Sequence, residues 1–158
     1  MAQLPEMQID LDTIYEVTLD TDKGRIALDL HPRLAPQTVN NFVSLARDGY
    51  YTGLTFHRVV PGFVVQGGDP TGTGRGGPGY KFADEPVQAE YVLGALAMAN
   101  SGPDTNGSQF FICIDDCQQK LAKSYNLFGY VTDGIEVAQT IAVGDKMNTV
   151  TITERAAE

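Results

Sequence analysis

The sequence is poor in residues that commonly bind metals. It contains only two cysteines and two histidines among 158 residues. Cys113 and Cys117 lie close together, but His31 and His57 lie far from them in sequence. A zinc site needs about four clustered ligands, and two thiols at this spacing are more often one buried cysteine and one loop cysteine. We therefore predict no metal site, and we expect no other cofactor.

Long apolar runs and basic residues are also scarce. No hydrophobic stretch approaches the roughly 20 residues needed to span a bilayer. Residues 1–11 contain Glu6 and Asp10 but no lysine or arginine, whereas a secretory signal has a basic start and an apolar run. The formal net charge of -9 repels phosphate and anionic membranes. We therefore expect a soluble cytoplasmic protein that binds neither nucleic acid nor membranes.

Hydrophobic patterning predicts one globular domain that begins with a hairpin and a helix. Hydrophobic residues make up 42% of the chain, enough for a single core at this length. Alternation over 15–19 and 25–30 predicts a β-hairpin. Pro36 suits the first position of a helix that extends to Asp48, and Gly49 follows as its C-terminal cap.

The rest of the chain favours a β-rich architecture. Asp133 and Glu136 resemble a capping box, which predicts a second helix that ends at Gly144. Many short strands, two separate helices and no regular βαβ alternation predict a mainly β fold, a closed antiparallel β-barrel with helices over its open ends. The further predicted strands are 55–60, 63–66, 96–99, 109–113, 128–131 and 149–153.

The stretch 54–69 carries one fixed positive charge, Arg58, among apolar neighbours. The period of a strand places Phe56 and Arg58 on one face, and Val64 and Gln66 share a face beyond the turn. A mostly apolar surface with two polar donors is typical of a small-ligand or peptide pocket. An arginine in a strand is, however, usually exposed and paired with a carboxylate, so spacing alone leaves both alternatives open.

Two other motifs have ordinary explanations. The run 72–77 matches the dinucleotide pattern GxGxxG, but Pro78-Gly79 follows it and no helical periodicity comes after, so we expect no nucleotide site. His57, Asp69 and Ser108 could be arranged as a hydrolase triad, but no nucleophile elbow surrounds Ser108. We therefore expect His57 to be a hydrogen-bonded core histidine.

Two long blocks of the sequence resemble the signature sequences of cyclophilins. They are Phe56-His-Arg-Val-Val-Pro-Gly-Phe-Val-Val-Gln-Gly-Gly-Asp69 and Met98-Ala-Asn-Ser-Gly-Pro-Asp-Thr-Asn-Gly-Ser-Gln-Phe-Phe-Ile112. The resemblance implies a domain over residues 15–154, between an extension (1–14) and a tail (155–158). It also implies an eight-stranded antiparallel barrel capped by two α-helices.

The activity that the resemblance implies is peptidyl-prolyl cis–trans isomerisation, with proline-containing polypeptides as substrates and a monomer as the working unit. A non-catalytic module that binds proline motifs is the alternative. Arg58 matches the family's catalytic arginine. Gln66 is predicted to orient Arg58, and Asn100 to bond the substrate backbone, so we assign catalytic roles to these three residues. The predicted substrate-binding residues are Phe63, Val64, Ala99, Ser101, Gln109, Phe111, Leu121 and Tyr125.

The sequence departs from the family pattern at Val64, where many members have methionine, at Ser101, which replaces a frequent alanine, and most clearly in one segment. The chain has no tryptophan, and the usual Trp-Leu-Asp-Gly-Lys-His becomes Lys120-Leu-Ala-Lys-Ser-Tyr125. Lys120 thus takes the tryptophan position and Tyr125 the histidine position. We therefore expect cyclosporin-type ligands to bind weakly, whereas the proline pocket keeps a flat wall from Tyr125.

Overall fold

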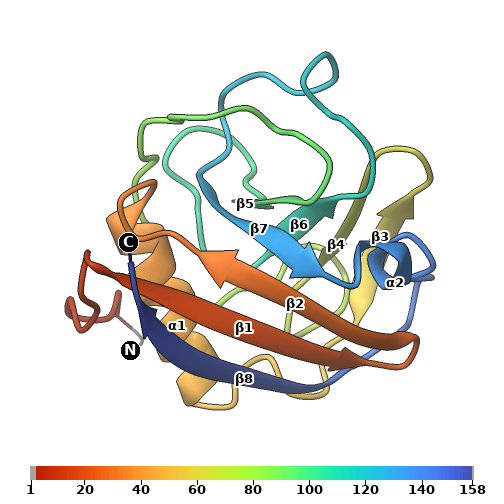
Figure 1. Ribbon diagram of the computed structural model, residues 1–158, viewed down its shortest axis with the longest axis horizontal. Coiled ribbons are helices and arrows are strands. Elements are labelled where there is room, and N and C mark those ends of the chain that lie inside the picture. The colour runs from red at the N-terminus through yellow and green to blue at the C-terminus, as the bar shows by residue number, and fades with distance from the viewer. Residues whose placement is uncertain (1–2, 158) are drawn as a thin grey trace.

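A computed structural model describes residues 3–157 as eight strands and two helices (Figure 1). Among these residues, no helix is long and apolar enough to cross a membrane. In chain order the elements are β1 (Thr13–Thr21), β2 (Gly24–Leu30), α1 (Pro36–Arg47), β3 (Phe56–Val60), β4 (Val64–Gly67), β5 (Ala95–Met98), β6 (Phe110–Cys113), β7 (Leu127–Asp133), α2 (Ile135–Ala138) and β8 (Met147–Ala156).

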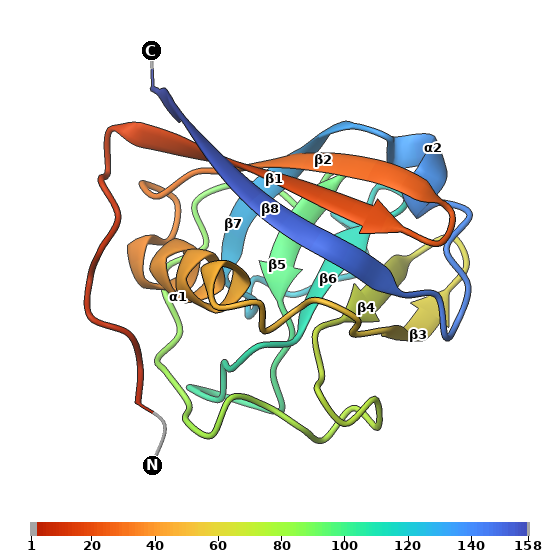
Figure 2. The same ribbon diagram turned by 90° about the horizontal axis from the view of Figure 1, so that it is seen from below.

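All eight strands belong to one curled sheet in the order β3-β4-β6-β5-β7-β2-β1-β8, and neighbouring strands are antiparallel. The prediction of a closed barrel is wrong, because the ladder ends at β3 and β8. Within residues 3–157 the two ends of the sheet meet over a short contact, an isolated bridge between Thr55 and Lys146 flanked by backbone hydrogen bonds from Phe56 to Asp145 (2.9 Å) and from Met147 to Leu54 (2.8 Å). Beyond it, β8 follows β1 away from the five-residue β3 (Figure 2).

The predicted hairpin and first helix are confirmed. β1 and β2 pair in register from Tyr15–Leu30 to Thr21–Gly24. Pro36 opens α1, and Gly49 follows it with a φ of 77°, a conformation that favours glycine. The N-cap residue Ala35 offers no side-chain acceptor. Instead, the Glu85 carboxylate accepts hydrogen bonds from the N–H groups of Gln37 (3.1 Å) and Thr38 (2.8 Å). α1 packs against β7 and β8 (Figure 2).

The second helix is much shorter than predicted. Asp133 is the last residue of β7 and makes no capping hydrogen bond. Gly134 takes the N-cap position with a φ of 85°, so the capping-box interpretation is wrong. The helix ends at Ala138 rather than near Gly144. Ala138 and Ile141 are nevertheless buried, and α2 packs against β2.

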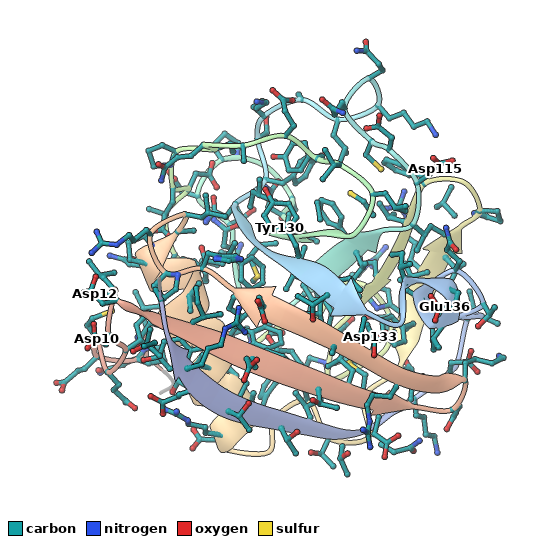
Figure 3. The ribbon with its side chains drawn as sticks, viewed as in Figure 1. Asp10, Asp12, Asp115, Tyr130, Asp133 and Glu136 are labelled. Carbon is teal, nitrogen blue, oxygen red and sulfur yellow. The ribbon has the colours of Figure 1, made fainter. Side chains whose placement is uncertain are left out.

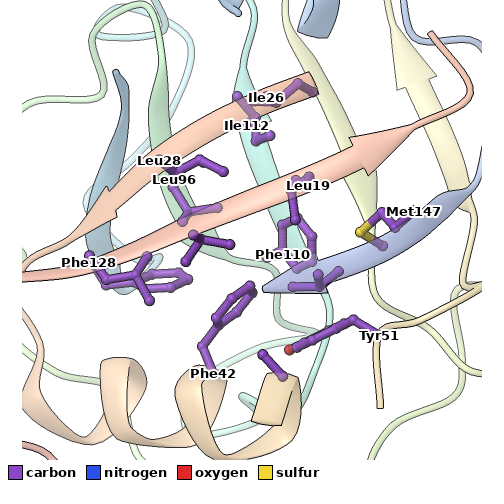
Figure 4. Packing of buried hydrophobic residues seen from close by; sticks show 14 of the residues in the cluster. Leu19, Ile26, Leu28, Phe42, Tyr51, Leu96, Phe110, Ile112, Phe128 and Met147 are labelled. Carbon is purple, nitrogen blue, oxygen red and sulfur yellow. The ribbon is translucent and has the colours of Figure 1, made fainter. Parts of the chain in front are cut away.

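The main hydrophobic core lies between the sheet and α1, with Phe42 at its centre (Figure 4). The Phe42 ring stacks on Tyr51, with 4.8 Å between ring centroids, and meets Phe110 edge-on at 5.5 Å. Aromatic pairs in these geometries add roughly 0.5–1.5 kcal/mol beyond the burial of their area. This core fixes the sheet on which the candidate site is built.

A second apolar cluster covers the opposite face of β4, β5 and β6. On β6, Phe110 and Ile112 point into the main core, whereas Phe111 and Cys113 point into the second cluster. Because successive side chains of a strand alternate between faces, these strands are buried on both sides. The second cluster forms the floor of the candidate active site.

Candidate active site

A β-bulge decides where Arg58 points. In the ladder between β3 and β4, Phe56 pairs with Gly67 and Arg58 pairs with Gln66, which leaves His57 as an extra residue. An extra residue breaks the strict alternation of a strand. Phe56 is fully buried in the main core, while Arg58 is exposed on the other face. The prediction that both share one face is therefore wrong.

Arg58 is held by an amide and not by a carboxylate. Its Nη1 donates a hydrogen bond to Oε1 of Gln66 (3.1 Å), and Nε2 of Gln66 donates to Oε1 of Gln109 (3.1 Å). Among residues 3–157, no acidic side chain forms an ion pair with Arg58. The usual alternative for a strand arginine, a surface ion pair, therefore does not apply, and donors of the guanidinium face open space.

Arg58 lies at a cavity of about 530 Å³ that gathers nine of the eleven predicted site residues. These nine are Arg58, Phe63, Val64, Gln66, Ala99, Asn100, Phe111, Leu121 and Tyr125. The other two, Ser101 and Gln109, line a neighbouring cavity of about 790 Å³. Both cavities share Gln66, Gly74, Ala99 and Asn100, so they form one continuous groove.

One side of the smaller cavity is apolar and rigidly supported. Phe111 is 4% exposed and meets Tyr125 edge-on, with ring centroids 5.5 Å apart. Tyr91 secures Tyr125, since its hydroxyl donates to the Tyr125 carbonyl (2.6 Å) and accepts from the Tyr125 N–H (3.1 Å). Phe63 is anchored through its carbonyl, which accepts from the N–H of Ile114 (2.9 Å). The segment 118–126 that carries Tyr125 is irregular, without helix or strand.

Asn100 brings free backbone groups to the shared wall of the groove. Its side chain is occupied locally, because Nδ2 donates to the Ser124 carbonyl (2.9 Å) and Oδ1 accepts from the Gly102 N–H (3.2 Å). Within the described part of the chain, the N–H and C=O of Asn100 have no hydrogen-bond partner. These groups can therefore bond an extended peptide that lies in the groove.

Sequence reasoning missed three contributors to the smaller cavity: His57, Thr73 and Gly74. His57 is half-buried at the cavity, so the prediction of a core histidine is wrong, and its Nδ1 has no hydrogen-bond partner among residues 3–157. Burial lowers the pKa of His57 below its usual value, which keeps the ring neutral at pH 7. The glycine-rich run at 72–79 was the available signal for the loop that lines both cavities.

The structure does not assemble the hydrolase triad or a thiol nucleophile. The hydroxyl of Ser108 is buried and donates to the Gly68 carbonyl (2.6 Å). Cys113 and Cys117 are both buried, and burial raises the pKa of each thiol, so neither is a thiolate at pH 7. Within 3–157, no three His, Cys, Asp or Glu side chains gather as metal ligands do.

The larger cavity differs in charge from the rest of the surface. Acidic side chains are spread over the exterior, and five of them, Asp10, Asp12, Asp115, Asp133 and Glu136, are labelled in Figure 3. The larger cavity, in contrast, has two charged residues in its lining, Arg75 and Lys81, and both are exposed cations.

Comparison with known proteins identifies the family. Residues 16–156 match the family described as cyclophilin type peptidyl-prolyl cis-trans isomerase/CLD. The chain belongs to the cyclophilin family. This cyclophilin is 50% identical over 133 residues to peptidyl-prolyl cis-trans isomerase B of Bacillus subtilis, covering 83% of this chain and 92% of the relative. It is 46% identical over 144 residues to a peptidyl-prolyl cis-trans isomerase of Synechococcus elongatus, covering 90% and 99% of the two chains.

Solved structures agree with this assignment. The crystal structure of a cyclophilin type peptidyl-prolyl cis-trans isomerase from Cryptosporidium parvum matches with a TM-score of 0.82 and 34% identity, over 89% of this chain and 98% of that one. A structure of the same protein in the presence of the dipeptide Ala-Pro matches with a TM-score of 0.80 over 87% and 98% of the chains. The cyclophilin fold is therefore shared by all three.

Proposed function

We propose that this cyclophilin accelerates rotation about exposed Xaa-Pro peptide bonds in flexible polypeptides, and so assists protein folding, with residues 15–154 as the isomerase domain. One observation carries the proposal. The Arg58 guanidinium is oriented by Gln66, lacks a carboxylate partner within the described residues, and lies at the cavity whose apolar side includes Phe63 and Phe111.

The chemistry requires neither an acid nor a nucleophile. An Xaa-Pro bond rotates over a barrier of about 18–20 kcal/mol, because rotation breaks the amide resonance. In the twisted transition state the prolyl nitrogen regains a lone pair, and charge separation across the amide is lost. Arg58 donates a hydrogen bond to that nitrogen, because its guanidinium carries several N–H donors in a fixed planar arrangement. Catalysis results because this bond is stronger in the transition state than in the planar ground state.

The remaining groups hold the substrate while the bond rotates. Phe63, Phe111 and Leu121 pack around the proline ring, and Val64 and Tyr125 complete the cavity. The free N–H and C=O of Asn100 bond the substrate backbone. All of these groups come from one chain, so the proposed working unit is a monomer. An acceleration of about 10⁵-fold corresponds to about 7 kcal/mol, which several aimed interactions can supply together.

A binding module without activity is the second candidate, because the same groove fits a proline motif. The crystal structure obtained with Ala-Pro belongs to a relative whose name describes it as an isomerase, which supports the enzymatic alternative. The free donors of Arg58 favour it as well. A module that only binds would gain nothing from a cation aimed at the amide nitrogen.

A protease-coupled assay on a proline-containing peptide separates the two candidates. We expect the wild-type protein to isomerise the peptide far above the uncatalysed rate, and Arg58→Ala to lose most of that activity. The matched control is Arg33→Ala, because Arg33 is an exposed arginine that pairs with Asp12 away from the groove. Wild-type protein at the uncatalysed rate, with peptide binding intact, would leave only the binding module.

A further inference from the structure

A buried carboxylate organises the glycine-rich loop beside the site. Asp69 is 1% exposed and lies at the start of this loop. Its Oδ1 accepts hydrogen bonds from the N–H and the hydroxyl of Thr71, both at 2.8 Å, and its Oδ2 accepts from the N–H of Gly74 at 2.5 Å. The loop therefore wraps around one carboxylate, with donors on both of its oxygens.

The close approach of the loop depends on a glycine. A Cβ atom on Gly76 would lie 2.0 Å from Oδ1 of Asp69 and 2.8 Å from Oγ1 of Thr71. Burial opposes ionisation of Asp69, but hydrogen bonds from Thr71, Gly76 and Gly74 outweigh it and lower the pKa to about 2. At neutral pH, Asp69 is thus a pure acceptor that fixes the loop backbone.

The same loop presents two carbonyl groups to the polar network of the site. Nε2 of Gln109 donates to the carbonyls of Gly74 and Gly76, both at 3.0 Å. Oε1 of Gln109 accepts from Gln66, whose own oxygen accepts from Arg58. Two sets of hydrogen bonds, joined through the loop backbone at Gly74, therefore connect the buried carboxylate with the guanidinium.

Arg58 at one end of this network and the loop carbonyls at the other fix the orientation of the Gln66 and Gln109 side-chain amides. Arg58 can only donate, so Gln66 must turn its oxygen toward Arg58 and its NH₂ group toward Gln109. The carbonyls of Gly74 and Gly76 can only accept, so Gln109 must turn its NH₂ group toward the loop. If the loop carbonyls moved away, Gln109 would lose the restraint that keeps its oxygen on Gln66.

We propose that Asp69 is a positioning residue for isomerisation, which fixes the direction of the Arg58 guanidinium through the loop carbonyls, Gln109 and Gln66. The inference rests on the proposed role of Arg58. Asp69 touches neither the substrate nor Arg58, so its effect passes through Gln109. If Asp69 merely stabilised the loop, Asp69→Asn would lower the folding stability, and any effect on kcat would add to that of Gln109→Met.

A double-mutant cycle tests this dependence. Asp69→Asn keeps one acceptor but places an NH₂ group against the loop N–H groups, and Gln109→Met keeps the side-chain length without the amide. We expect each change to lower kcat by about tenfold, with KM altered less than about threefold in Asp69→Asn, and the double variant to be no slower than either single one. The matched control is Asp29→Asn, a buried carboxylate paired with Arg155 outside the groove, which should leave kcat unchanged.

The proposal would be overturned by full kcat in Asp69→Asn, or by a further tenfold loss when Asp69→Asn is added to Gln109→Met. If Asp69→Asn does not fold, Thr71→Val removes one donor to the carboxylate and should still lower kcat measurably; unchanged kcat in that variant would also count against it. Arg58→Ala in the same assay separates this failure from that of the proposed function. If Arg58→Ala stays fully active, the catalytic role of Arg58 fails, whatever Asp69 does.

Discussion

Replacing Asp69 with asparagine should remove a pH-dependent part of the folding stability. The hydrogen bonds to this carboxylate lower its pKa from 3.8 to about 2 in the folded protein. Since the folded-state pKa is depressed, the stabilisation is present above pH 4 and is lost as the pH falls toward 2, where the unfolded chain binds the proton more readily. With about 1.36 kcal/mol for each pKa unit, the loss is about 2 kcal/mol at pH 2.

Urea denaturation followed by circular dichroism measures this quantity, because the seven tyrosines and no tryptophan make the fluorescence signal weak. The free energy of unfolding of the wild-type protein should fall by about 2 kcal/mol more than that of Asp69→Asn between pH 5 and pH 2. Other acidic groups titrate in both proteins, so the difference between the two curves isolates Asp69. If the free energy of unfolding of the two proteins changed with pH in parallel over this range, the loop would not stabilise the ionised carboxylate.

Two further predictions concern ligands of the groove. Because Arg75 and Lys81 line the larger cavity, peptides with a glutamate near the proline should show a several-fold higher kcat/KM than lysine-bearing peptides at low salt. This preference should disappear in the double variant Arg75→Gln, Lys81→Gln. Equal kcat/KM values for the two peptides with the wild-type protein would contradict the prediction. Cyclosporin should bind with a dissociation constant on the order of micromolar or above in a calorimetric titration. The reason is that Lys120 stands at the position of the family's tryptophan, and its Nζ donates to the Gly62 carbonyl at 2.6 Å. Nanomolar binding would contradict this prediction.

The regular elements were predictable because their signals are local. The hairpin follows from alternating hydrophobicity, and α1 follows from Pro36, Gly49 and helical spacing. The helix after Asp133 was predicted too long, because beyond Ala138 the backbone bonds tighten to the third residue back, from Thr140 to Val137 (2.9 Å) and from Ile141 to Ala138 (3.3 Å). The open edge between β3 and β8 was not predictable, because strand patterns do not encode whether the ends of a sheet meet.

The candidate site, too, was predictable from the sequence only in part. The apolar strands and the single arginine indicated a pocket, but the resemblance to cyclophilins supplied Phe111, Leu121 and Tyr125, which are far from Arg58 in sequence. The bulge at His57 reverses the face expected from a period of two, and no residue type announces it. The loop residues Arg75 and Lys81 of the larger cavity were missed because this cavity forms where two distant loops converge.

The central claim is that the Arg58 guanidinium stabilises the twisted amide rather than the bound peptide. NMR exchange spectroscopy on a proline-containing peptide saturated with enzyme measures the rate of cis–trans interconversion in the bound state, separately from affinity. Arg58→Ala should lower this bound-state rate by about 10²-fold or more, the cost of one aimed donor, while the peptide dissociation constant changes less than about threefold. An unchanged bound-state rate in Arg58→Ala would contradict the claim.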